Sequence, residues 1–317
     1  MTATSPTEAL SYYGRPIVKE PVWEKDIPLY FFTGGLAGAS DLLALGAQLS
    51  GNPRLRTSAL AAATAGVAIS PYFLIKDLGR PLRFLNMLRV FKVTSPMSVG
   101  TWIFSAESTA TGIAAACRLF GVMPRVRATA QVFAGLIGPA QATYTGALVA
   151  QSVVPAWHEA RRELPVLFAS SAAASAGGAA AILTPAEHAG PARRLGLIGG
   201  VAELAVSKLM ERRLGKLVGS VYHEGEAGKY SRLATASTLA GTTLMARAGR
   251  HRTGAVAAGV LLLTGSLCKR FAVYHAGKQS ARDPHHTSIP QKKRGGRAVT
   301  QPSGRTGNGS SPSGPTR

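Results

Sequence analysis

The sequence has few charged residues and only two cysteines, and each shortage excludes a class of protein. Charged residues make up 16% of the 317 residues, against roughly 25% in ordinary soluble domains. This shortage indicates lipid rather than water around much of the surface. Cys117 and Cys268 cannot ligate an iron–sulfur cluster, which usually takes four ligands. A single disulfide between them stays an open alternative.

None of the seven histidines lies in the interior of a clear apolar segment. They are His158, His188, His223, His251, His275, His285 and His286. Haem held between membrane helices usually needs axial histidines there. We therefore expect neither haem nor an iron–sulfur cluster in this chain. The sequence also has no metal-ligand spacing, phosphate-binding glycine loop or nucleophile–base arrangement, so we expect no metal site and assign no catalytic residue.

The net charge of +21 has two possible meanings. It is typical of proteins that bind nucleic acid, or of membrane proteins with basic cytoplasmic loops. Because long apolar segments separate the basic clusters, we favour the second interpretation. It makes membrane lipid a partner and excludes nucleic acid.

Eight segments are candidates for membrane-spanning helices, each of which needs about 20 mainly apolar residues. They cover residues 27–49, 57–75, 96–117, 129–154, 164–184, 192–210, 233–249 and 253–273. The last two are weaker, and the eighth carries Lys269 and Arg270 near its predicted end. Runs this long and evenly apolar favour helices over barrel strands. The prediction is an all-α integral membrane protein.

The ends of the chain differ from its middle. Residues 1–26 are polar and lack the apolar core of a signal peptide, so we expect the first span to act as its own insertion signal. From residue 276 to 317 the chain is rich in Ser, Gly, Pro, Lys and Arg, which predicts a disordered basic tail. Its "KKRGGR" stretch either touches anionic lipid or is simply solvated. More of the 36 basic residues lie on the side of the two termini, which predicts that both are cytoplasmic.

Three acidic residues fall inside predicted spans, where charge is costly and often functional. Asp41 lies roughly 20 Å along the first span and Glu107 roughly 16 Å into the third; Glu203 lies in the sixth. Asp41 and Glu107 are candidates for a proton path, and Glu107 also for a quinone-facing acid. The alternative is a structural hydrogen bond to a neighbouring helix.

The fourth predicted span has a polar face. Gln141, Tyr144 and Thr145 are three and four residues apart, so they share one side of a helix. A tyrosine hydroxyl can donate a hydrogen bond to a quinone carbonyl, and its ring can stack on the headgroup. The alternative is that this face only joins helices within the bundle.

Three stretches of the first half resemble one protein family. "DLGRPLRFLNMLRVFKVTSPMSVGTW", which begins at Asp77, resembles the signature loop of the NrfD family, the membrane subunits of polysulfide reductase-like complexes. "IPLYFFTGGLAGAS" (27–40) is similar to that family's first span and "YTGALVA" (144–150) to its fourth. The resemblance covers about residues 12–155. It implies two four-helix bundles, which we place at 27–155 and 156–275.

The resemblance also implies a function. Such subunits anchor respiratory oxidoreductases in the bacterial plasma membrane and react with quinone, either menaquinone or ubiquinone. They exchange electrons with a four-cluster iron–sulfur protein, which serves a molybdopterin catalytic subunit. By analogy, the candidate quinone ligands are Tyr144, Glu107, Gln141 and Trp23. Tyr144 would lie roughly 15 Å from the end of its span, beneath the loop that begins at Asp77.

The basic residues of that loop form a candidate docking surface for an acidic partner. The residues are Asp77, Arg80, Arg83, Arg89 and Lys92. An alternative is that the cations only hold the loop at the level of lipid phosphates, with Asp77 pairing to one of them. Two other functions stay open for the whole chain: a secondary transporter that uses the buried acids, and a purely structural anchor.

Overall fold

The computed structural model describes residues 18–78, 80 and 82–283, and this part of the chain is helical without strands. Its elements are α1 (Asp26–Leu49), α2 (Pro53–Asp77), α3 (Arg83–Arg89), α4 (Pro96–Leu119), α5 (Pro124–Ala150), α6 (Pro155–Glu159), α7 (Leu164–Leu183), α8 (Gly190–Gly219), η1 (Ser220–Tyr222), α9 (Gly225–Ala248) and α10 (Arg252–Arg282). Long helices occupy all eight predicted segments. The short α3 and α6 were not predicted.

Local signals account for where the helices begin. Proline occupies the first turn of α2, α4, α5, α6, α7 and α8, where its missing N–H costs nothing. The side chains of Asn52 and Ser95 accept hydrogen bonds from the amides of Leu55 and Ser98, and thereby cap α2 and α4. Gly51 and Gly121 adopt positive φ in the turns that follow α1 and α4.

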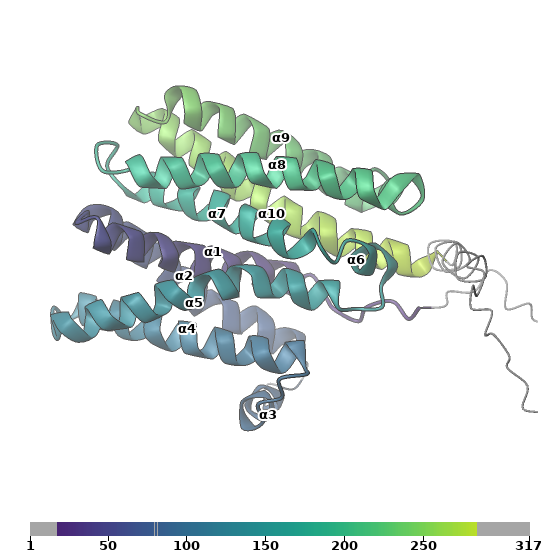
Figure 1. The fold of residues 1–317 in the computed structure, drawn as a ribbon, viewed down its shortest axis with the longest axis horizontal. Helices are drawn as coiled ribbons and strands as arrows, with labels where there is room; N and C mark the ends of the chain where they lie inside the picture. Colours follow the sequence, from purple (N-terminus) through teal and green to yellow (C-terminus); the bar gives the residue numbers. More distant parts are fainter. Residues whose placement is uncertain (1–17, 79, 81, 284–317) are drawn as a thin grey trace, which may run out of the picture.

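The eight long helices pack as two rings of four. In the first ring α1, α2, α4 and α5 contact one another in sequence, and in the second α7, α8, α9 and α10 do so. Helix α7 joins the rings through contacts with α1, α2 and α5, and α10 also contacts α1. Figure 1 shows all eight helices running roughly side by side, with the loop that carries α3 at the same end as both termini of the described chain.

Four of these helices, α1, α2, α7 and α10, are long and apolar enough to cross a membrane. They support an integral membrane protein. Helices α4, α5, α8 and α9 are at least 24 residues long, so each is long enough to span the hydrocarbon core. That these four also cross the membrane remains our prediction.

Glycines allow the helices of each ring to approach closely. A Cβ atom added at Gly38 would overlap the carbonyl oxygen of Gly138, so α1 and α5 touch through their backbones. A Cβ atom at Gly177 would overlap the backbone of Gly196, which brings α7 against α8. Such close contacts are typical of helix packing in membranes.

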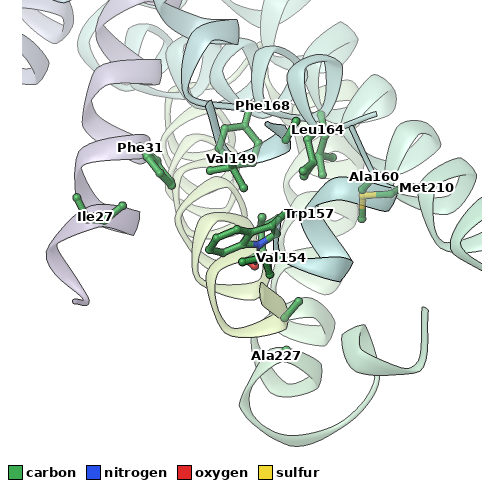
Figure 2. Close-up of a cluster of buried hydrophobic side chains, with 14 of the residues drawn as sticks. Ile27, Phe31, Val149, Val154, Trp157, Ala160, Leu164, Phe168, Met210 and Ala227 are labelled. Carbon is green, nitrogen blue, oxygen red and sulfur yellow. Dashed lines mark hydrogen bonds between the residues drawn. The ribbon is translucent and has the colours of Figure 1, made fainter. Parts of the chain in front are cut away.

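A cluster of large apolar side chains lies where the two rings meet near α6. It includes Phe31 of α1, Trp157 of α6 and Phe168 of α7, and Figure 2 shows these converging from three helices. Trp157 is 1% exposed and its indole N–H donates to the carbonyl of Val273 at 2.7 Å. Because Gly277 has no Cβ, the Trp157 ring lies directly against α10. This cluster fixes α6 between the bundles.

The residues that precede α1 are fastened to the end of α10. The hydroxyl of Tyr274 donates to the carbonyl of Trp23 at 2.6 Å, and Lys278 donates to the same carbonyl at 3.2 Å. The guanidinium of Arg282 holds the carboxylate of Glu20 through two hydrogen bonds. These contacts and the burial of Ala281 keep the chain helical to Arg282, beyond the predicted start of the tail at residue 276. Residues 284–317 of that tail lie outside the described part.

Two predicted helix ends are corrected by the structure. Helix α5 ends at Ala150 rather than at Val154, because the chain turns before Pro155. Tyr144 is therefore about 9 Å from the end of its helix, not 15 Å. Helix α10 extends past Val273, so Arg270 lies well inside the helix and is 0% exposed.

Candidate functional site

A small pocket opens in the first bundle beneath the loop that carries α3. Its lining includes Trp23, Tyr30, Asp77, Thr101 and Tyr144, together with apolar side chains of α1, α2, α3, α4 and α5. The cavity measures about 80 Å³. A mainly apolar pocket with a few polar groups is the usual form of a small-molecule site. Three predicted residues, Trp23, Asp77 and Tyr144, thus come together here.

Tyr144 is positioned by a glycine on the neighbouring helix. A Cβ atom at Gly100 of α4 would overlap the ring of Tyr144, so only glycine lets the ring lie across that helix. The hydroxyl of Tyr144 lies beside that of Tyr30 on α1. Two phenolic groups from different helices therefore meet at the wall of the pocket.

Trp23 is held by aromatic contacts on two sides. Its ring stacks on Trp157 at 5.6 Å between centroids and meets the edge of Phe31 at 6.2 Å. Its backbone carbonyl accepts the two bonds from α10 described above. Trp23 is thus a rigid part of the pocket wall whose position depends on both bundles.

Asp77 fixes the entry to α1. Its carboxylate accepts a hydrogen bond from the backbone N–H of Glu24 at 2.9 Å, and the adjacent Lys76 forms an ion pair with Asp26 at 3.0 Å. The structure therefore gives Asp77 a backbone partner instead of the loop cation suggested by the sequence.

The loop cations, Arg80, Arg83, Arg89 and Lys92, are all exposed. Within the described residues none of the four forms an ion pair. Exposed apolar side chains lie among them, including Leu82 and Val93 at 76% and 75% exposure. Helix α3 itself buries no residue. The loop therefore presents a mixed basic and apolar surface at the mouth of the pocket.

Gln141 lies one turn deeper than Tyr144. Gly34 of α1 leaves room for its amide, since a Cβ atom there would lie 2.8 Å from Nε2. Both polar atoms of this amide are buried without a hydrogen-bond partner, although the amide lies beside the hydroxyl of Tyr30. Gln141 does not line the pocket; it stands behind Tyr30 and Tyr144.

The acid pair, Asp41 and Glu107, lies deeper still. Both side chains are 0% exposed, and they are close enough to interact electrostatically. The hydroxyl of Thr111 donates to Asp41 at 2.6 Å, whereas both oxygens of Glu107 lack a hydrogen-bond partner. No Lys or Arg is buried among the described residues of α1, α2, α4 and α5. Because burying carboxylates without counter-charge is costly, this arrangement favours a pair that holds at least one proton.

Glu203, the third predicted acid, belongs to the second bundle. It accepts a hydrogen bond from Thr238 at 3.2 Å. Buried Arg270, which sequence reasoning missed, interacts electrostatically with Glu203. Arg270 donates to the carbonyl of Phe168 at 2.8 Å, and its guanidinium carbon lies 3.8 Å from the centre of that ring.

Sequence reasoning also missed two lining residues, Tyr30 and Thr101. An aromatic residue among apolar neighbours usually indicates a core position. Gly34 could have indicated the role of Tyr30. It lies one turn later on the same face of the helix, and a glycine there leaves space beside the tyrosine ring. In the described part of the chain, no group of three or more His, Cys, Asp or Glu side chains could hold a metal ion, and both cysteines are free.

Comparison with known proteins places the chain in a family. A search of curated proteins found no significant match. The profile of the family described as "Polysulphide reductase, NrfD" matches residues 17–280, which includes both bundles, the pocket and the loop. The resemblance inferred from three short stretches is thereby confirmed over most of the chain. The protein belongs to the NrfD family of polysulphide reductase-type membrane subunits.

Proposed function

We propose that this chain is the quinone-reactive membrane subunit of a respiratory oxidoreductase. It exchanges electrons between menaquinone or ubiquinone and a four-cluster iron–sulfur protein, which in turn serves a molybdopterin catalytic subunit. The observation that carries this proposal is the pair of phenolic hydroxyls, Tyr30 and Tyr144, at a pocket with buried acids behind it. A bound quinone supplies redox chemistry in which two electrons and two protons are taken up or released.

The polar groups of the pocket fit a quinone headgroup, but its volume requires a moving wall. The cavity of about 80 Å³ has roughly half the volume of an engineered protein cavity of ~150 Å³ that binds benzene. Met87 of α3 and Met97 of α4 line the pocket, and unbranched methionines repack readily. We infer that the headgroup enters when α3 and these side chains shift, while Trp23 and Tyr144 keep their places.

Polar side chains continue from the pocket towards the middle of the bundle. From the ends of their helices on the pocket side, Tyr144 lies about 9 Å deep, Gln141 about 13 Å, Glu107 about 16 Å and Asp41 about 22 Å. Tyr144 orients the headgroup by donating a hydrogen bond. The pair of Glu107 and Asp41 carries a proton and exchanges it with the quinone site along this series of polar side chains. The unpartnered amide of Gln141 is available to relay a hydrogen bond between them.

The exposed loop is the proposed docking surface for the iron–sulfur partner. Its four cations, which form no ion pair within the described residues, attract an acidic surface, and its exposed apolar residues pack against that surface. Docking there brings a cluster close to the pocket on the side of both termini. We place this side in the cytoplasm of a bacterial cell, with all eight long helices crossing the plasma membrane.

The first experiment is purification of the chain in mild detergent from its natural host, followed by identification of co-purifying proteins. Iron, molybdenum and extractable quinone are assayed in the same sample. An iron–sulfur partner with bound quinone is the expected result. A single chain without iron or quinone, under conditions that preserve a known membrane complex, would instead support a secondary transporter.

The second experiment tests the pocket in the assembled complex. Tyr144→Phe removes one hydroxyl, and we expect quinol-dependent turnover to fall about tenfold or more, as for loss of a positioned hydrogen bond. The matched control is Tyr72→Phe, because Tyr72 is 62% exposed on α2. If both variants assemble and turn over like wild type, a purely structural anchor replaces this proposal.

A further inference from the structure

A cluster of five arginines lies at the end of the first bundle away from the pocket. It comprises Arg54, Arg56, Arg118, Arg125 and Arg127. Arg54 and Arg56 begin α2, Arg118 lies in the last turn of α4, and Arg125 and Arg127 begin α5. Figure 1 shows these helix ends opposite the loop that carries α3. This arginine cluster plays no part in the proposed quinone chemistry.

The charges of the arginine cluster are not compensated. Arg56 is close enough to Arg118 and Arg127 to interact unfavourably with both. Within the described residues none of the five forms an ion pair, and Nε of Arg127 is buried without a hydrogen-bond partner. Helix α5 also begins without a side-chain cap, so its first amides add positive potential at the same place. An anion would relieve this repulsion and satisfy the buried donor.

An apolar groove begins beside this cluster and runs along the outside of α4 and α5. It measures about 720 Å³ and extends from Arg125 to Trp102. Ile113, Val126 and Phe133 line it and are 43%, 45% and 51% exposed. From Trp102 to Ile113 the groove is about 16 Å long, close to half of the ~30 Å hydrocarbon core. Its length therefore matches one leaflet of the bilayer.

We propose that this groove and the arginine cluster together bind one anionic phospholipid. The phosphate lies in the arginine cluster, whose member Arg125 also lines the groove, and guanidinium groups bind phosphate through paired hydrogen bonds. An acyl chain lies along the groove. A free phosphate ion would leave the groove empty, and a neutral quinone headgroup would leave the arginines uncompensated. The inference does not depend on the proposed function of the pocket.

The test uses the full chain in mild detergent and native mass spectrometry with added dioleoyl phosphatidylglycerol or dioleoyl phosphatidylcholine. We expect wild type to retain the anionic lipid preferentially. The double variant Arg118→Gln and Arg127→Gln should bind it at least about tenfold more weakly, since hydrogen bonds to charged groups are the strong ones. The matched control is Arg194→Gln, an exposed arginine in the first turns of α8 at the same end of the molecule.

A second variant tests the groove without changing charge. Ala130→Phe fills the groove beside Phe133, and should weaken binding of the dioleoyl lipid while leaving a short-chain phosphatidylglycerol unaffected. Thermal unfolding of each variant shows that the fold is intact. Three results would overturn the proposal: equal binding by the double variant and Arg194→Gln, displacement of the lipid by millimolar inorganic phosphate, or a protein partner seated in the groove of the purified complex.

Discussion

The two bundles bury charge in different ways. In the described part of the first, Asp41 and Glu107 are buried without a buried base, and three of their four carboxyl oxygens have no hydrogen-bond partner. In the second, Glu203 accepts from Thr238 and interacts electrostatically with Arg270, which donates to Phe168 and lies against its ring. Glu203 Oε2 and two guanidinium nitrogens of Arg270 also lack a hydrogen-bond partner, but here the two opposite charges offset each other. Compensated charge is typical of structural positions, whereas uncompensated charge is typical of sites that exchange protons. On this comparison we expect the chemistry to lie in the first bundle and a structural role in the second.

The bundles also differ in how tightly they close. The middle of helix α7 in the second bundle consists of small residues. A Cβ atom at Gly178 of α7 would meet the backbone of α10, and one at Gly199 of α8 would meet the backbone of α7. The first bundle instead leaves a pocket under a loop whose helix α3 buries nothing. A site that admits a ligand needs a wall that can move. In the described part of the chain, the loop that carries α3 is such a wall for the pocket of the first bundle.

The largest expected effect concerns the buried cation of the second bundle. Arg270→Met removes a charged hydrogen bond and the favourable interaction of Arg270 with buried Glu203, so we expect a loss of about 3–5 kcal/mol in stability. Thermal unfolding in detergent measures it. Arg247→Met, at an exposed position of α9, is the control. A variant as stable as this control would show that Arg270 has no structural role, and would weaken the comparison.

The next effect concerns the acid pair. Glu107→Gln should lower quinol-dependent turnover about 100-fold, the lower range for loss of a proton-transferring group, with little change in unfolding temperature. Glu203→Gln is the matched control, because it makes the same change at a buried acid of the second bundle. Equal turnover in the two variants would remove the distinction between the bundles.

A smaller effect tests the placement of Tyr144. In Gly100→Ala the new methyl group would overlap the Tyr144 ring, so the ring must turn away, and turnover should fall about tenfold. Gly112→Ala on the same helix has nothing within 4 Å of its new Cβ and should keep wild-type turnover. Turnover is measured on samples of the two variants that contain equal amounts of assembled complex. Equal turnover would show that the position of the tyrosine ring does not matter.

The smallest effect concerns the link between the bundles. The hydrogen bond from Arg282 lowers the pKa of the Glu20 carboxyl from its ordinary value of 4.5. The contribution of this contact to folding stability is therefore fully present above pH 4.5. It is lost as the pH falls through the lower pKa that Glu20 has in the folded state. Because Glu20 is near the surface, the contribution is below about 1 kcal/mol. Glu20→Gln should abolish this part of the pH dependence of unfolding and leave the stability at acidic pH unchanged.

The positions of the long helices could be predicted from the sequence, and those of the short helices could not. Pro96 and Leu164 were placed at helix starts because each stands at the border of a long apolar run. Helices α3 and α6 have 7 and 5 residues, too few for periodicity to reveal them. The end of α10 was misplaced because Lys269 and Arg270 suggested a membrane border, whereas both are buried, and Arg270 lies against Phe168 of α7 and Gly35 of α1.

The candidate site was predicted in part. Two of the candidate quinone ligands, Trp23 and Tyr144, line one pocket together with Asp77, a candidate of the docking loop. The other two, Gln141 and Glu107, do not line it. Tyr30 was missed because what distinguishes it from a core residue is its contact with Gln141 and Tyr144. These two residues lie more than a hundred positions later in the chain. The functional roles of all these residues, and of the loop cations, stay predictions that the experiments above address.

By itself the sequence determined the membrane class, the eight long helices and the burial of Asp41, Glu107 and Glu203, because hydropathy is a sum over neighbouring residues. The burial of Asp26 and Glu163 at helix ends was not predicted. Only the tertiary structure decided which buried charges are compensated. Thr111 reaches Asp41 from 70 positions away and Arg270 reaches Phe168 from 102. The cost of a buried charge depends on the polar groups that other helices bring to it, and those helices meet only in the folded bundle.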